Sequence, residues 1–150
     1  MPTEINAILF LHAFATVAMT GLIWFVQVVH YPMFARVGRD AFTEYERVHQ
    51  QRTTWIVGPL MLLELATAIW LAVRPPADVP APIVWGGVAL LAVIWASTAF
   101  LQVPAHRALE NGFDERHAHR LVSTNWIRTI AWTIRALLAL WLLQIAGVST

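Results

Sequence analysis

The stretch IVWGGVALLAVIWASTAFLQV, from Ile83 to Val103, contains no charged residue. A helix needs about 20 apolar residues to cross the hydrocarbon core of a bilayer, and this stretch has that length. Three further apolar segments accompany it, from about Ile5 to Val29, from about Thr54 to Val73 and from about Leu121 to Ala146. The 150 residues therefore predict a single all-α domain, an integral membrane four-helix bundle.

The composition of the chain supports a membrane protein. Hydrophobic residues make up 58% and charged residues 13%, about half the charged share of an average soluble domain. This composition excludes the water-soluble, nucleic-acid-binding and disordered classes, and the expected partner is the lipid bilayer. The chain has neither Lys nor Cys, which excludes Schiff-base chemistry, thiolate nucleophiles and thiolate-bound metals.

Arginine placement predicts the orientation in the membrane. Loops 30–53 and 104–120 carry seven of the ten arginines, whereas the connection between the second and third segments carries only Arg74. By the positive-inside rule both long loops are cytoplasmic, and both termini lie outside a multi-pass protein of the cell membrane. The loops are expected to extend the helices, with Asp40 and Asp114 as N-caps.

The two halves of the sequence resemble each other. The segment Phe25–Val28 (FVQV) matches Phe100–Val103 (FLQV), and a histidine follows in each half, His30 and His106. This pattern predicts two duplicated helical hairpins with the same orientation, related by an axis along the membrane normal.

Each predicted helix carries one stripe of polar residues, and four such stripes can meet only inside a bundle. With the predicted topology, most of these residues fall in the cytoplasmic half. They form either a pocket for a small lipophilic ligand or interhelical hydrogen bonds that hold the helices together. The residues of this layer are Gln27, His30, His49, Thr53, Gln102, His106, Asn125 and Arg128.

Two further features lie deeper in the predicted bundle. Glu64 and Arg135 each fall near the middle of a span, where an unpaired charge is costly, so they are expected to form a structural ion pair. A proton or substrate relay is the alternative role for this pair. His12 stands alone in the outer half, either as a hydrogen-bonded core residue or as a cofactor ligand.

The second half is similar to a known family. The segment Thr98–Leu109, followed by Asn125-Trp-Ile-Arg128-Thr129, resembles the anthrone-oxygenase-like family of small four-helix membrane proteins. That family shows an N-V-P-x-N-x-x-L motif at the end of helix three and an N-x-x-R-T motif in helix four. Gln102 and His106 stand at the positions of the two asparagines of the first motif.

The resemblance implies an oxygenase-like membrane enzyme acting on a flat phenolic or quinol-like lipophile. Oxidation of an anthrone requires a base that removes an activated C–H proton, and a histidine suits this role. His30 or His106 is the expected base. Because oxygen can react with the resulting carbanion directly, no cofactor is obligatory. The enolate oxygen would be stabilised by preorganised donors from Gln102, Asn125 and Arg128.

Two other functions remain open at this point. The first half is weakly similar to the bacterial four-helix, haem-binding protoporphyrinogen oxidase, through Leu11-His12, Gly21-Leu22 and Pro59-Leu60-Met61. That likeness implies haem binding through His12, although the lysine of that family is absent here. Independently of the likeness, three histidines in one layer, with Glu64 deeper, could ligate iron, copper or zinc, and His49 is the second candidate cofactor ligand. The repeat and the midplane charges also fit a small transporter or channel subunit, which would require a homo-oligomer.

Overall fold

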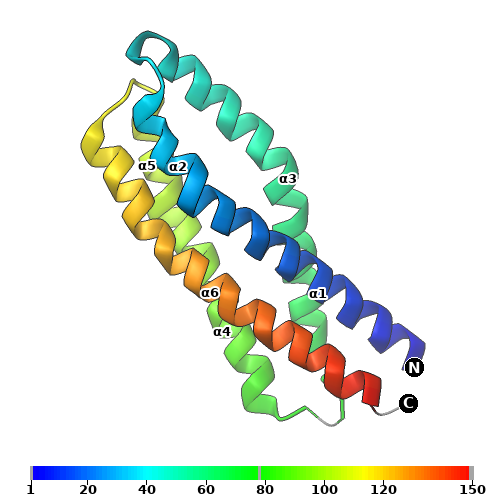
Figure 1. Ribbon diagram of the computed structural model, residues 1–150. Coiled ribbons are helices and arrows are strands. Elements are labelled where there is room, and N and C mark those ends of the chain that lie inside the picture. The colour runs from blue at the N-terminus through cyan, green and yellow to red at the C-terminus, as the bar shows by residue number, and fades with distance from the viewer. Residues whose placement is uncertain (1, 78, 149–150) are drawn as a thin grey trace.

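The computed structural model describes residues 2–77 and 79–148. It confirms the all-helical fold, and this part of the chain has four helical rods that are long and apolar enough to cross a membrane. Figure 1 shows the rods side by side, with both termini and the connection near Arg74 at one end of the bundle. The rods are Glu4–Arg36, Arg39–Val73, Ala81–Leu109 and Glu115–Ile145.

The first and third rods are interrupted by wide π-helical turns. In these turns the N–H of Tyr31 donates to the carbonyl of Val26, and the N–H of Val103 donates to that of Thr98. One residue separates each turn from a proline, Pro32 or Pro104, which has no N–H to continue the α-helical ladder. Such turns are common at functional sites. The elements are α1 (Pro2–Phe25), η1 (Val26–His30), α2 (Tyr31–Met33) and η2 (Phe34–Arg36), then α4 (Ala81–Ser97), η3 (Thr98–Gln102) and α5 (Val103–Leu109).

The second and fourth rods are the long helices α3 (Arg39–Val73) and α6 (Glu115–Val148). Both begin well before the apolar segments, as predicted. Asp114 precedes α6, and its Oδ1 accepts the backbone N–H of His117 at 2.9 Å, which lowers the pKa of this carboxyl group. The prediction of Asp40 as an N-cap is wrong. Gly38, with an extended backbone, precedes α3, and Asp40 lies in its first turn.

Helix α3 bows away from α1 in the middle of the bundle (Figure 1). Pro59 lies inside this helix, where it removes the hydrogen bond to the carbonyl of Trp55. Helix α3 contacts α1 more extensively than it contacts α4 or α5, and its residues between His49 and Leu62 line a cavity between the rods.

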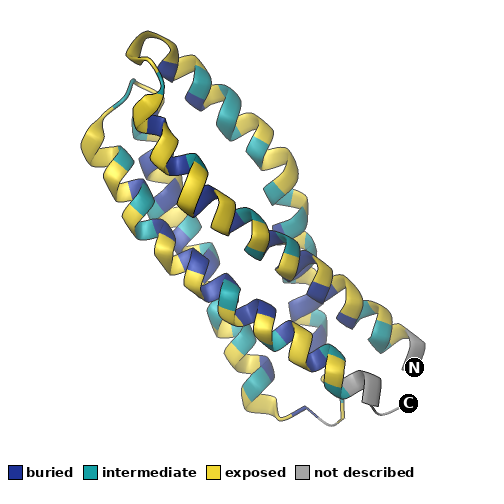
Figure 2. Ribbon diagram, viewed as in Figure 1, coloured by how far each residue is buried: buried dark blue, intermediate teal, exposed yellow. Residues whose placement is uncertain are grey.

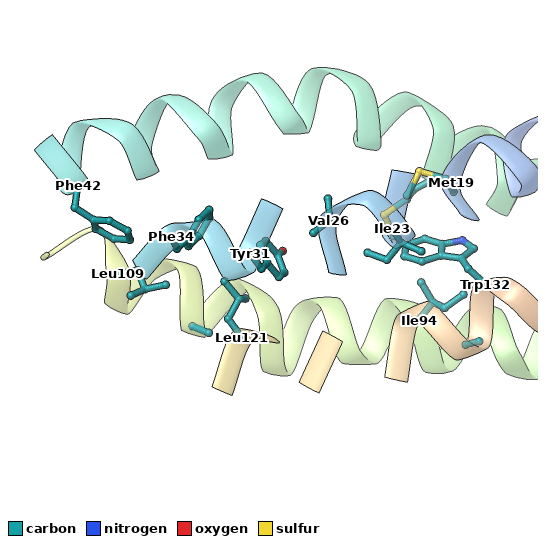
Figure 3. Packing of buried hydrophobic residues seen from close by; sticks show 13 residues of the cluster. Met19, Ile23, Val26, Tyr31, Phe34, Phe42, Ile94, Leu109, Leu121 and Trp132 are labelled. Atoms are coloured by element: carbon teal, nitrogen blue, oxygen red, sulfur yellow. The ribbon is translucent and has the colours of Figure 1, made fainter. Parts of the chain in front are cut away.

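The buried residues face inward along all four rods, as Figure 2 shows. The main apolar cluster runs from Phe42 and Leu109 past Tyr31 to Met19 and Trp132 (Figure 3). Large apolar side chains also cover the outer surface. Trp55 is 77% exposed and Phe100 is 75% exposed. An apolar exterior of this extent suits contact with lipid rather than water.

Candidate functional site

A cavity of about 380 Å³ lies between α1, α3, α6 and the η3–α5 segment. Its walls are mainly apolar, with Met19, Ile23 and Met61 among the side chains that form them. Polar groups gather toward the η1 and η3 turns. A cavity with apolar walls and a few convergent polar groups is the usual form of a small-molecule site. The polar lining residues include Tyr31, His49, Thr53, Trp95, Thr98, Gln102, His106 and Arg128.

The hydroxyl of Tyr31 is at the centre of the polar end. Its oxygen lies 2.9 Å from Nε2 of His106 on α5. Nη2 of Arg128, on α6, donates to the same oxygen at 3.4 Å. Tyr31 is buried, and it follows the η1 turn directly. The wide turn thus places a phenol between an imidazole and a guanidinium.

His106 also contacts a buried carboxylate. Its Nδ1 lies 2.5 Å from Oε1 of Glu46, and the amide of Gln50 donates to the same oxygen at 3.2 Å. Glu46 is not part of the predicted polar layer, although it lies on the predicted helical extension before the second apolar segment. A signal was present, since Glu46, His49 and Thr53 follow a helical spacing that places them on one face.

Asn125 orients the guanidinium of Arg128. Both Nε and Nη2 of Arg128 donate to Oδ1 of Asn125, at 2.9 and 2.5 Å. Asn125 in turn donates to Oε1 of Gln27 at 2.8 Å, and Gln27 donates to the carbonyl of Val122. Asn125 and Gln27 therefore lie behind the guanidinium, which they orient, and Arg128 is the group that faces the cavity.

Two polar atoms at the cavity have no hydrogen-bond partner among the described residues. They are Nε1 of Trp95, a donor, and Oε1 of Gln102, an acceptor. The amide nitrogen of Gln102 donates to Thr124 at 2.9 Å, which fixes the direction of its oxygen. A buried polar group without a partner costs about 1–3 kcal/mol. Both side chains line the cavity, but the two atoms themselves are buried, so a ligand with an acceptor and a donor could satisfy them only if these side chains turned toward it.

The expected layer of three histidines is present, but its members are not equivalent. The ring centroids of His49 and His106 lie 5.6 Å apart, and those of His30 and His49 lie 4.4 Å apart. Nε2 of His30 lies 2.9 Å from Nδ1 of His49, which also contacts Thr53. His49 and His106 line the cavity, whereas His30 lies behind His49 against Phe34. Of the two expected bases, His106 therefore has the more suitable position.

The two expected cofactor ligands lie at opposite ends of the bundle. Nδ1 of His12 lies 2.9 Å from the hydroxyl of Thr67. Thr67 and His49 are separated by five helical turns of α3, roughly 27 Å at 1.5 Å per residue. His12 and His49 therefore cannot share one haem or metal ion. Within residues 2–77 and 79–148, no three His, Asp or Glu side chains come together in a way that could hold a metal.

Glu64 and Arg135 meet in the interior. Nε of Arg135 donates to Oε1 of Glu64 at 2.8 Å, and both side chains are buried. Thr16 donates to the same carboxylate at 3.0 Å and Trp132 at 2.9 Å, while Nη1 of Arg135 donates to the carbonyl of Gly87. The carboxylate thus has several donors as well as a cation, which is the arrangement a buried charge requires.

The exposed part of the cavity lining, which we take as its opening, lies on α3 and at the start of α5. Lining residues that remain exposed are Thr54, Leu62 at 59% and Val103 at 39%. Two of these three are apolar, and the adjacent outer surface is apolar as well. A ligand that is dissolved in lipid could therefore enter from the side of the bundle.

Comparisons of the chain with models of protein families, with curated proteins and with solved structures found no match. The resemblances noted in the sequence therefore depend on their short motifs alone, and the geometry of the cavity must support a function by itself.

Proposed function

We propose that the four rods cross the cell membrane, with the turns near Gly38 and Gly112 in the cytoplasm and both termini outside. The arginine-rich loops at that end and the apolar outer surface support this orientation. The cavity then lies in the cytoplasmic half of the bilayer, with its opening toward lipid.

We further propose that the two hairpins derive from a duplication. A π turn overlaps each of the two matching segments, and a proline follows soon after each turn; Gln27 is the second residue of η1 and Gln102 the last residue of η3, so the turns are shifted by three positions relative to the matched residues. Each π turn contributes a buried glutamine, Gln27 or Gln102, to the polar layer. A shared local geometry of this uncommon kind supports a common origin.

The function that the cavity supports best is an oxygenase-like reaction on a small, flat phenolic or quinol-like lipophile. One observation carries this proposal: an apolar cavity ends in a buried guanidinium, a phenol and two unpaired polar atoms. The apolar walls suit an aromatic ring system, and the charge of Arg128 suits an oxygen that becomes negative. Nε1 of Trp95 and Oε1 of Gln102 suit a carbonyl and a hydroxyl group of the ligand.

The reaction would start with removal of a proton from an activated CH₂ carbon between two aromatic rings. The electron pair of the C–H bond is delocalised onto the carbonyl oxygen of the substrate. Arg128 and the indole N–H of Trp95 stabilise the resulting enolate. Molecular oxygen then adds to the carbon and forms a hydroperoxide. Loss of water gives the quinone, so that CH₂ and O₂ become C=O and H₂O.

The test is the conversion of an anthrone to the anthraquinone by purified protein in lipid nanodiscs. We expect oxygen consumption and quinone formation above the rate in protein-free nanodiscs, and loss of this excess in Arg128→Gln. A wild-type protein that binds the anthrone without accelerating its oxidation would exclude an oxygenase and leave a binding protein.

A further inference from the structure

A chain of three hydrogen-bonding side chains leads away from the cavity, and each comes from a different element. Tyr31 of α2 contacts Nε2 of His106 on α5 at 2.9 Å, and Nδ1 of His106 contacts Glu46 on α3 at 2.5 Å. The order is phenol, imidazole and carboxylate. This is the arrangement in which a base is oriented by a third group.

We infer that Tyr31 is the proton acceptor of the cavity, and that His106 and Glu46 give it this capacity. The inference rests on the proposed function, since the substrate must supply an acidic C–H group. The proton moves from carbon to the hydroxyl oxygen of Tyr31, while the proton of Tyr31 passes to Nε2 of His106. The electron pair stays on the substrate until oxygen adds to the carbon, and the proton then returns to the peroxide anion, which becomes the hydroperoxide that loses water.

The direction of the chain follows from the groups that surround Tyr31. Arg128 donates to the phenol oxygen and has no lone pair to accept a proton in return. The inferred relay requires that the O–H of Tyr31 point to Nε2 of His106, which the 2.9 Å distance allows. Nε2 is then unprotonated, and Nδ1 carries the proton that is donated to Glu46.

The buried negative charge of Glu46 favours the transfer of a proton to His106. This side chain is fully buried, and its Oε2 has no hydrogen-bond partner within the described residues. A buried carboxylate is costly without a cation beside it. When His106 takes up the proton of Tyr31, it becomes that cation, so the proton transfer creates an ion pair and offsets part of its own cost. If Glu46 served only to hold the helices together, a neutral glutamine at this position would be sufficient.

The first test needs no substrate. Nitrogen-15 NMR of histidine-labelled protein reports which ring nitrogen of His106 carries the proton. We expect the proton on Nδ1, with a shift of the Nε2 signal in Tyr31→Phe and of the Nδ1 proton in Glu46→Gln. A proton on Nε2 instead of Nδ1 would overturn the inference, because His106 could then not accept from Tyr31.

The second test separates proton removal from reaction with oxygen. An anthrone is incubated with protein in nanodiscs in D₂O under argon, and deuterium entry into its CH₂ group is followed by NMR. We expect Tyr31→Phe, His106→Gln and Glu46→Gln to lower the protein-dependent rate by about 10²–10⁴-fold, and Glu46→Asp to recover part of it. Tyr45→Phe is the control, since Tyr45 packs in the adjacent aromatic cluster against Phe34.

The outcomes distinguish this inference from the proposed function. Exchange under argon without quinone formation in air would refute the oxygenase and leave the proton relay intact. Binding without exchange, or exchange in Glu46→Gln at the wild-type rate, would refute the relay. If the anthrone does not bind, the tautomer of His106 in the ligand-free protein decides whether the relay is kept or rejected.

Discussion

Nε of Arg135 lies 2.8 Å from Oε1 of Glu64, although 71 positions separate the two residues in the chain. Both are buried, and each lies near the middle of the apolar segment of its rod, so each neutralises a charge that the other would leave in an apolar interior. Thr16 and Trp132 provide two further donors to the carboxylate. The pair thus connects α3 to α6, and α1 joins it through Thr16.

Removing one charge of this pair should destabilise the protein more than removing both charges. We expect Glu64→Gln alone and Arg135→Gln alone each to destabilise the protein by about 3–5 kcal/mol, because each leaves an uncompensated buried charge. The double variant should be more stable than either single one. Unfolding in detergent measures this coupling, and additive losses would show that the two charges act independently.

Removing the unpaired indole N–H should change stability and binding in opposite directions. Trp95→Phe deletes a buried donor that has no partner among the described residues, so the empty protein should unfold at the same or a higher temperature. Affinity for an anthraquinone should fall, since its carbonyl loses a donor. Equal affinity in both proteins would mean that Nε1 does not contact the ligand.

The side opening predicts that a larger side chain at its rim slows ligand entry. Leu62 lines the cavity and is 59% exposed, whereas Ile69, on the same helix, is 53% exposed and lies toward the other end. Leu62→Trp should lower the association rate of a lipid-dissolved ligand severalfold in stopped-flow measurements. Ile69→Trp is the matched control. Equal slowing by both substitutions would argue against entry between α3 and α5.

The proposed orientation makes a prediction for reporter fusions. A reporter fused after residue 150 should be active only outside the cell, and reporters inserted near Gly38 or Gly112 only in the cytoplasm. A cytoplasmic C-terminus would move the cavity to the outer half of the membrane.

Much of the helical fold could be predicted because the length of an apolar segment is a local property of the sequence. The spacing of Asn125 and Arg128 also places both on one face of a helix, and they are in contact. The meeting of Glu64 with Arg135 follows from their common depth.

Tyr31 and Glu46 were harder to predict. Hydropathy detects the lipid-facing part of a rod, so it does not show that the polar start of α3, although predicted as helical, brings Glu46 into the bundle interior. The π turn before Tyr31 shifts the helical phase, so that a regular 3.6-residue spacing does not show which way the phenol points. The unpaired atoms of Trp95 and Gln102 depend on contacts between helices, which a single sequence does not reveal.

The central claim is that the guanidinium of Arg128 binds the oxygen of a phenolic ligand inside the cavity. Absorption of a hydroxyanthraquinone in nanodiscs tests it directly, because a phenolate absorbs at longer wavelength than the phenol. We predict a saturable shift to longer wavelength with the wild-type protein. Arg128→Gln, which keeps a donor for Asn125, should abolish the shift and weaken binding by about ten- to a hundredfold, since hydrogen bonds to charged groups contribute roughly 1.5–3 kcal/mol. Thr67→Val, beside His12 at the other end, should leave the shift unchanged. The same shift in Arg128→Gln, or no saturable shift in the wild type, would contradict the claim.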